Sequence, residues 1–203
     1  MKKTKDNLML LNAVFITSLL IANVVAGKIV LLFGVFVVPA AVVCYAITFL
    51  MTDVIGEIWG REEAQKAVKR GFITQILASL LILMARYLPV APFAVETQNA
   101  YLILLGQNWR FVIASMTAYL ISQTNDVLIF HKLKEKYKGR HKWIRNNLST
   151  MSSQLIDTAI FITIAFAGQV PNLWIMIVSQ YFIKLCLAGL DTPLFYWFTH
   201  GEK

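Results

Sequence analysis

Six long apolar stretches run along the chain, and short polar or basic segments separate them. A helix needs roughly 20 mostly apolar residues to cross a bilayer. We interpret the first stretch as a retained helix, because it is too long for a signal-peptide core. The pattern therefore predicts an all-α membrane protein with one transmembrane domain over residues 1–203. Its six spans are expected at Leu8–Ala26, Ala40–Trp59, Gly71–Tyr87, Phe111–Phe130, Leu148–Phe166 and Leu173–Phe198.

Two of the connections between these spans are unusual. The segment Ile29–Val38 is rich in β-branched residues and is divided by Gly34, so we expect a short hairpin or re-entrant segment before the second span. Pro39 follows it and suits the first turn of a helix. The loop Leu88–Asn108 contains an apolar run at Ala100–Leu105, which predicts an interfacial helix, and its role stays open.

The composition agrees with a membrane protein. Of the 203 residues, 58% are hydrophobic and 15% are charged, and the mean hydropathy is +0.63. Soluble domains carry about 25% charged residues. A chain this apolar cannot cover itself with polar surface, so the lipid bilayer must be part of its solvent. This disfavours a soluble enzyme, a nucleic-acid-binding module and a disordered regulator.

The net charge of +8 is arranged as an orientation signal. Basic residues gather in the N-terminal tail, after the second span and in the segment Lys132–Arg145, while the alternate connections hold few. The positive-inside rule then places both termini of this multi-pass protein in the cytoplasm. Cys44 and Cys186 lie in apolar stretches with no metal-ligand spacing, and we expect no metal and no cofactor.

A short pattern occurs twice. Ser122-Gln123-x-x-Asp126 returns 31 residues later as Ser153-Gln154-x-x-Asp157, on the next span and therefore in the opposite membrane direction. Duplicated elements of opposite topology occur in secondary transporters. The alternative is that the match arises by chance, because apolar spans use few residue types.

Ionisable residues lie inside the expected spans, namely Asp53, Asp126, Asp157, Lys184 and Asp191. Left unpaired, five such groups would cost about 12–17 kcal/mol, as much as a whole domain's stability. At 1.5 Å per residue, the four aspartates fall in one layer of the cytoplasmic half. We therefore expect them to face the bundle interior, with Lys184 pairing with Asp191 or Asp157, and Arg145 reaching only the rim.

The chain resembles a known family through a set of short motifs that cover nearly its whole length. They are Asn23…Lys28, Tyr45…Thr48-Phe49…Asp53…Glu57…Gly60, Ala118-Tyr119…Gln123…Asp126, Arg145-Asn146…Ser149-Thr150…Gln154…Asp157-Thr158…Phe161 and Lys184…Asp191-Thr192-Pro193…Tyr196. This pattern is similar to that of the queuosine precursor transporters, the YhhQ-like or VUT family of six-span inner-membrane proteins.

The resemblance implies import of 7-deazaguanine precursors of queuosine, a modified tRNA base. The expected substrates are 7-cyano-7-deazaguanine, its aminomethyl relative and, in some members, queuine. The residues expected to bind the substrate are Asp126, Asp157, Gln123, Gln154, Asn23, Tyr45, Tyr119, Phe161, Asp53 and Asp191. Those expected to pair charges or couple protons are Lys184, Glu57, Arg145 and Lys28.

Two other functions compete with this hypothesis. A substrate-capture subunit of an ATP-driven vitamin importer is also six-span, and Ala22-x-x-x-Ala26 fits the face such subunits use. An intramembrane enzyme or assembly factor is disfavoured, because the chain has no nucleophile–base pair and no catalytic motif. A bundle of six short helices is small for alternating access, so a homodimer and a monomer both stay open.

Overall fold

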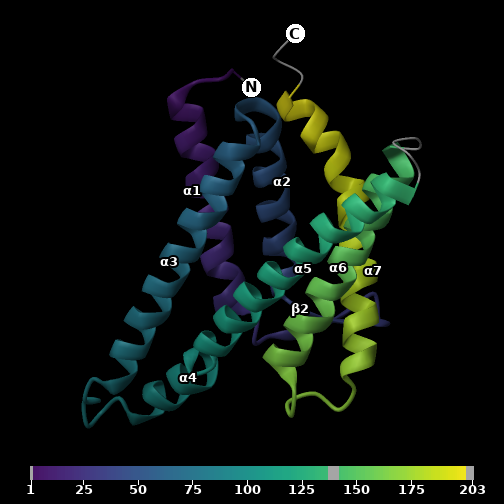
Figure 1. The fold of residues 1–203 in the computed structure, drawn as a ribbon. Coiled ribbons are helices and arrows are strands. Elements are labelled where there is room, and N and C mark those ends of the chain that lie inside the picture. Colours follow the sequence, from purple (N-terminus) through teal and green to yellow (C-terminus); the bar gives the residue numbers. More distant parts are fainter. Residues whose placement is uncertain (1, 137–141, 200–203) are drawn as a thin grey trace.

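The computed structural model describes residues 2–136 and 142–199, and these are mostly helical (Figure 1). Its elements, in chain order, are α1 (Lys5–Val25), β1 (Ile29–Leu32), β2 (Phe36–Pro39), α2 (Ala41–Trp59), α3 (Arg61–Tyr87), α4 (Val95–Leu105), α5 (Asn108–Lys136), α6 (Lys142–Phe166) and α7 (Leu173–Thr199). Each of the six expected spans lies within, or within one residue of, a helix. The helices extend beyond the spans mainly where the flanking sequence is polar, as at the start of α3.

Helix α1 is capped at its first turn, and its own carbonyls accept hydrogen bonds from the amide groups of two asparagines. The Thr4 hydroxyl accepts a hydrogen bond from the backbone N–H of Asn7 (3.3 Å), as an N-cap residue does. The Asn12 amide donates to the Leu8 carbonyl (2.7 Å), and the Asn23 amide donates to the Leu19 carbonyl (3.5 Å). The two asparagines thus enter an apolar helix without breaking it.

The segment between α1 and α2 is a β-hairpin, as expected. Ile29 pairs with Pro39 and Leu32 with Phe36 in an antiparallel register. The turn contains Phe33 at φ 52° and Gly34 at φ 71°. Gly34 thus adopts a left-handed backbone conformation, which glycine adopts more readily than residues with a Cβ atom. The expectation for Pro39 is wrong, because it is the last residue of β2 and pairs with Ile29 instead of opening the helix.

The hairpin is held against α7. The rings of Phe36 and Phe182 stack with centroids 5.1 Å apart, and Val38 is fully buried with Val42 and Ile183. The backbone N–H of Ala40 donates to the Lys28 carbonyl (2.8 Å), which closes the base of the hairpin. The short segment before α2 therefore packs on the bundle.

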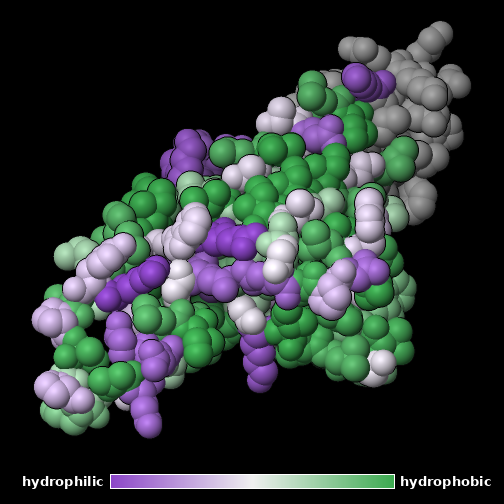
Figure 2. All heavy atoms as spheres, turned by 90° about the horizontal axis from the view of Figure 1, so that it is seen from below, coloured by the Kyte–Doolittle hydropathy of each residue, from purple (hydrophilic) through white to green (hydrophobic). Residues whose placement is uncertain are grey.

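The helices alternate in direction through the bundle. Figure 1 shows that α1 begins, α2 ends and α7 ends at one end of the molecule, whereas the hairpin and α4 lie toward the opposite end. Figure 2 views that opposite end, where polar residues gather near the middle and hydrophobic residues surround them. The predicted alternation of basic connections requires successive helices to run in opposite directions, and the described long helices do so.

Among the described residues, three helices (α1, α2 and α3) are long and apolar enough to cross a membrane. Helices α6 and α7 carry shorter apolar segments at Met151–Phe166 and Leu173–Leu187. The described chain thus contains membrane-spanning candidates, and six spans with both termini in the cytoplasm stay a prediction.

Two buried apolar clusters hold the helices together. One, toward the hairpin end, joins α1, α2, α5, α6 and α7 through small residues such as Ala22, Ala26 and Ala114 and through Phe111 and Phe166. The other joins α1, α2 and α3 around residues such as Phe15, Leu19 and Val54. Small side chains at the helix contacts let the backbones approach closely, as in most membrane bundles.

Helix α4 lies beside the end of α3, where Tyr101 donates to the Ile82 carbonyl (2.9 Å). None of its residues is buried, and Ile103 is 77% exposed. The helix that was expected at Ala100–Leu105 is present and begins earlier, at Val95. Its exposed apolar side chains suit a helix at a membrane interface, which stays a prediction.

The close approach of α3 to α1 requires Gly71. A Cβ atom at this position would lie 2.7 Å from Phe15 Cε1 and 2.9 Å from Leu19 Cδ2. We expect Gly71→Val to destabilise the protein by about 1–3 kcal/mol, the usual cost of overpacking. The measurement is the midpoint of thermal unfolding of the purified protein in detergent.

Gly56→Ala is the matched control for this prediction. A Cβ at Gly56 would meet only Ala64 Cβ, at an ordinary 3.7 Å. Alanine in a helix interior is favoured over glycine by roughly 0.5–1 kcal/mol, so this variant should melt no lower than the wild type. Equal midpoints for Gly71→Val and Gly56→Ala would show that α1 and α3 are not packed as described.

Candidate substrate cavity

The helices surround a large cavity of about 970 Å³ that is partly open to the surroundings. Side chains from α1, α2, α3, α5, α6 and α7 line it, from Val42 near the start of α2 to Glu57 near its end. Asp53 and Glu57 are exposed, so the open part of the cavity faces the end where α2 meets α3. Toward the hairpin end, Phe161 lines the cavity and belongs to the buried cluster that contains Phe111 and Phe166.

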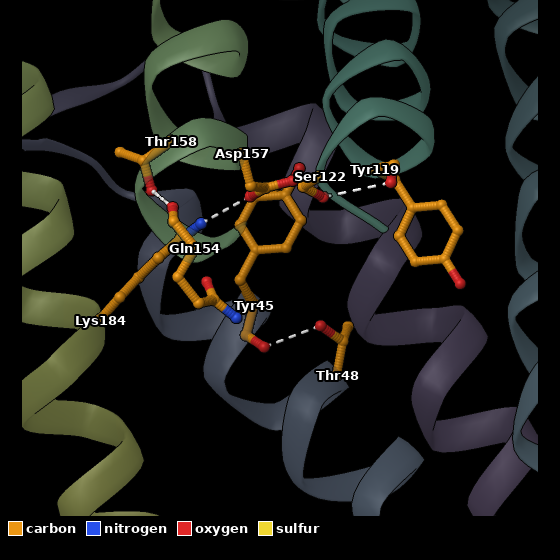
Figure 3. Close-up of polar contacts among 8 residues, drawn as sticks. All are labelled: Tyr45, Thr48, Tyr119, Ser122, Gln154, Asp157, Thr158 and Lys184. Atoms are coloured by element: carbon orange, nitrogen blue, oxygen red, sulfur yellow. Dashed lines mark hydrogen bonds and ion pairs between the residues drawn. The ribbon is translucent and has the colours of Figure 1, made fainter. Parts of the chain in front are cut away.

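An ion pair joins two helices in the cavity wall. Lys184 extends from α7 toward Asp157 on α6, and its Nζ lies 2.8 Å from Asp157 Oδ2 (Figure 3). The Lys184 side chain is 9% exposed and that of Asp157 is 24% exposed. The Lys184 ammonium also lies 5.8 Å from the centre of the Phe49 ring. Of the two partners expected for Lys184, the structure shows Asp157.

Three oxygen atoms in the cavity wall are buried without a hydrogen-bond partner among the described residues. They are Tyr45 Oη on α2, Gln154 Oε1 on α6 and Gln180 Oε1 on α7. The Ser115 side chain lies near the Tyr45 hydroxyl, without the distance and angles of a hydrogen bond. A buried polar group without a partner costs about 1–3 kcal/mol, and a bound ligand can remove this cost.

Other hydroxyl groups near the cavity are occupied by their own helices. Thr48 donates to the Tyr45 carbonyl (2.7 Å), Ser122 to the Tyr119 carbonyl (3.1 Å) and Thr158 to the Gln154 carbonyl (2.8 Å), as Figure 3 shows. Such bonds to carbonyls three or four residues back satisfy a hydroxyl inside an apolar helix. The three unpartnered oxygens and the ion pair are therefore stronger candidates for recognising a ligand than these hydroxyl groups are.

Aromatic rings from four helices, α2, α3, α5 and α6, complete the walls. Tyr45 packs edge-on against Phe161, with ring centroids 6.0 Å apart, and Tyr119 packs edge-on against Phe72 at 5.0 Å. These contacts fix the ring orientations. All four rings line the cavity, so it presents flat apolar surfaces beside its polar atoms.

Most of the expected site residues come together in this cavity. The described lining residues include Tyr45, Asp53, Glu57, Tyr119, Gln123, Gln154, Asp157, Phe161 and Lys184. Asn23 and Lys28 are not among them: Asn23 is buried in α1, and Lys28 is exposed at the base of the hairpin. The side chains of Asp126, Arg145 and Asp191 lie outside the described residues.

The duplicated pattern is explained in part. Helices α5 and α6, which carry its two copies, make the most extensive helix–helix contact in the described chain. Gln123 and Gln154, the matching glutamines, both line the cavity. The repeat thus brings equivalent amides from two helices of opposite direction to one space.

Sequence analysis missed several polar lining residues, among them Arg61, Gln65, Ser115 and Gln180. One signal was available for Gln180, because it lies four residues before Lys184 in the same apolar stretch and so shares its helix face. Arg61 and Gln65 lie in the polar first turns of α3, where the sequence suggests only a solvated helix end.

A bundle of apolar helices around a partly polar, aromatic-lined cavity is the architecture of a helical membrane transporter. The lining offers hydrogen-bond acceptors, one internally compensated ion pair and flat rings. Such a site suits a small planar ligand that carries several N–H groups.

Comparison with known proteins identifies the family. Residues 39–198 match the family described as "Putative vitamin uptake transporter", so the chain belongs to this family. A relative from Bacillus subtilis (strain 168), named "Probable queuosine precursor transporter", is 36% identical over 179 residues, which are 86% of this chain and 77% of the relative. No solved structure matches the chain.

A second relative has the same name and comes from Haemophilus influenzae (strain ATCC 51907 / DSM 11121 / KW20 / Rd). It is 28% identical over 121 residues, which are 58% of this chain and 47% of the relative. The resemblance to the VUT family that the motifs indicated is thereby confirmed.

The fold also bears on the alternative of an ATP-driven importer subunit. That alternative relied on Ala22 and Ala26 as a face that meets a partner protein. Both alanines are fully buried within this chain, packed in the cluster with Ala41, Ala114 and Ala118. They are therefore unavailable for such a contact in this conformation.

The ion pair should show the energetics of a buried pair. Lys184→Met leaves the Asp157 carboxylate in the wall without its partner. The free energy of unfolding should therefore fall by an amount at the low end of the roughly 3–5 kcal/mol that breaking a buried pair costs. The double variant Lys184→Met with Asp157→Asn removes both charges and should recover most of the lost thermal stability. If the double variant melts no higher than Lys184→Met alone, the pair does not stabilise the bundle.

Proposed function

We propose that this protein imports 7-deazaguanine precursors of queuosine across the bacterial inner membrane into the cytoplasm. The single observation that supports this most is the cavity, in which an acid, several amides and aromatic rings converge in a chain of this family. Both relatives are named probable queuosine precursor transporters, and these names supply the substrate class of the proposal.

The chemistry of a 7-deazaguanine ring suits the cavity. Its N1–H and 2-amino group are adjacent donors, and a carboxylate oxygen can accept from them in charge-assisted hydrogen bonds. Asp157 is the candidate acceptor, since Oδ2 is oriented by Lys184. The rings of Tyr45, Tyr119 and Phe161 offer apolar faces for stacking.

The amides of Gln123 and Gln154 are the candidates for the remaining polar atoms of the ring. An amide both donates and accepts, so it suits the O6 acceptor or the pyrrole N–H. Asp126 repeats Asp157 in the duplicated pattern and is proposed as a second acid of the site, with Asp191 as a third.

The end of the cavity where α2 meets α3 is proposed as the cytoplasmic mouth. Asp53 and Glu57 lie one helical turn apart at this end, and Arg61 and Gln65 line it from α3. A carboxyl group that takes up a proton outside and releases it inside couples uptake to the proton gradient. We propose Asp53, beside Glu57, for this role.

Loss of either duplicated acid should impair transport. Asp157→Asn and Asp126→Asn keep the side-chain volume but remove the charge, so uptake of 7-cyano-7-deazaguanine should fall at least about tenfold, the factor for one lost charge-assisted bond. The measurement is uptake of labelled base into liposomes that contain only this polypeptide.

The control for this measurement is Glu96→Gln, which neutralises an exposed acid on α4 outside the cavity. It should transport like the wild type. No uptake by wild-type liposomes would favour a subunit that needs an ATPase partner. Unchanged uptake by both Asn variants would remove the acids from the substrate site.

The proton gradient supplies a separate test. An inward gradient should drive accumulation of neutral 7-cyano-7-deazaguanine in these liposomes above its outside concentration, and a protonophore should abolish the accumulation. Asp53→Asn should still let the base equilibrate but should no longer concentrate it. Equilibration that a protonophore leaves unaltered would indicate facilitated diffusion and leave Asp53 without a coupling role.

A further inference from the structure

Gln180 is a buried glutamine in the cavity wall. It lies on α7, one helical turn before Lys184, and is 1% exposed. Its Oε1 has no hydrogen-bond partner among the described residues. An amide oxygen in this state, beside an open cavity, is an acceptor without a donor.

Unpartnered oxygens are concentrated around the cavity. Six buried side-chain oxygens of the described residues lack a partner, and three of them belong to residues that line this cavity, on α2, α6 and α7. The other three belong to Asn23, Gln75 and Asn108, which do not line it. A missing partner alone does not mark a ligand site, but convergence of three on one cavity indicates that a ligand supplies the donors.

The charge of the wall favours N–H donors on an uncharged ring. The Asp157 carboxylate is already compensated by Lys184 at 2.8 Å, so this pair does not call for a cation. Tyr45 Oη, Gln154 Oε1 and Gln180 Oε1 are neutral acceptors. An amino group has two N–H bonds and can donate to two acceptors at once. Gln180 and Asp157 suit this role, because Gln180 shares a face of α7 with Lys184, which pairs with Asp157.

We propose that Gln180 is a specificity-determining residue of the cavity and accepts a hydrogen bond from the exocyclic 2-amino group of the bound base. The inference takes its substrate class from the proposed function and adds that Gln180 selects this class through the 2-amino group. A ring without the 2-amino group leaves Gln180 Oε1 unpaired in the wall. Sites that hydrogen-bond a substrate group reject analogues that lack it, because their own buried groups stay unpaired.

The test compares two uncharged probes, 7-cyano-7-deazaguanine and its analogue without the 2-amino group. Their dissociation constants for the purified full-length chain in detergent are measured by isothermal titration. The wild type should prefer the first probe by about tenfold or more, the value of one hydrogen bond to a buried acceptor. Gln180→Met keeps the side-chain volume without the acceptor, and its preference should fall at least about fivefold below the wild-type value, because Asp157 alone then accepts from the 2-amino group.

Two further variants complete the design. Gln75→Met removes a glutamine that is equally buried and equally unpartnered but lies outside the cavity, and it should keep the wild-type preference. Gln180→Asn retains an amide but withdraws its oxygen by one methylene, so it should also lose the preference. Gln180→Asn replaces Gln180→Met in the comparison with the wild type if Gln180→Met does not elute as a single species in size-exclusion chromatography.

The outcomes separate the inference from the function beneath it. If the wild type binds both probes equally, or if the Gln180 variants keep the wild-type preference, the role of Gln180 is overturned while the substrate class stands. If the wild type binds neither probe, the proposed function is overturned, and the role of Gln180 with it. A preference lost in the Gln180 variants and kept in Gln75→Met supports the assignment.

Discussion

The ion pair between Lys184 and Asp157 is the contact on which the cavity depends. It joins α7 to α6 with an N–O distance of 2.8 Å, and each charge lies mostly out of water. Either charge alone would be expensive in an apolar bundle, so each requires the other. The pair also fixes the direction of the Asp157 carboxylate beside the cavity and leaves the neighbouring amides, Gln154 and Gln180, as neutral acceptors.

The two ends of the cavity differ in a way that suits directional passage of a solute. At one end, Asp53 and Glu57 are exposed and Arg61 lines the wall. At the other, Phe111, Phe161 and Phe166 pack in a buried cluster with alanines from α1, α2 and α5. The hairpin lies against α7 beyond this cluster, through the stacked rings of Phe36 and Phe182. Close packing at one end and charge at the other give a cavity open toward one side in the conformation described here.

Small residues make this packing feasible without large side chains between the helices. Ala22 and Ala26 are fully buried against α2, α5 and α6, and Gly71 lets α3 approach Phe15 and Leu19 on α1. Between helices in lipid, close packing replaces the hydrophobic effect as the main source of stability. A motif that in sequence suggested docking to a partner is therefore explained by packing within the chain.

The sequence by itself determined the helices, the hairpin and the face on which each polar residue lies. These features depend on local apolar length and on periodicities of 3.6 and 2, which neighbouring residues set. It also indicated the family, through motifs spread along the chain. Only the tertiary structure decided that Asp157 pairs with Lys184, that Gln180 lines the cavity and that Asn23 does not. Those outcomes depend on how each helix is rotated and tilted against its neighbours, and packing between residues distant in the chain sets that rotation.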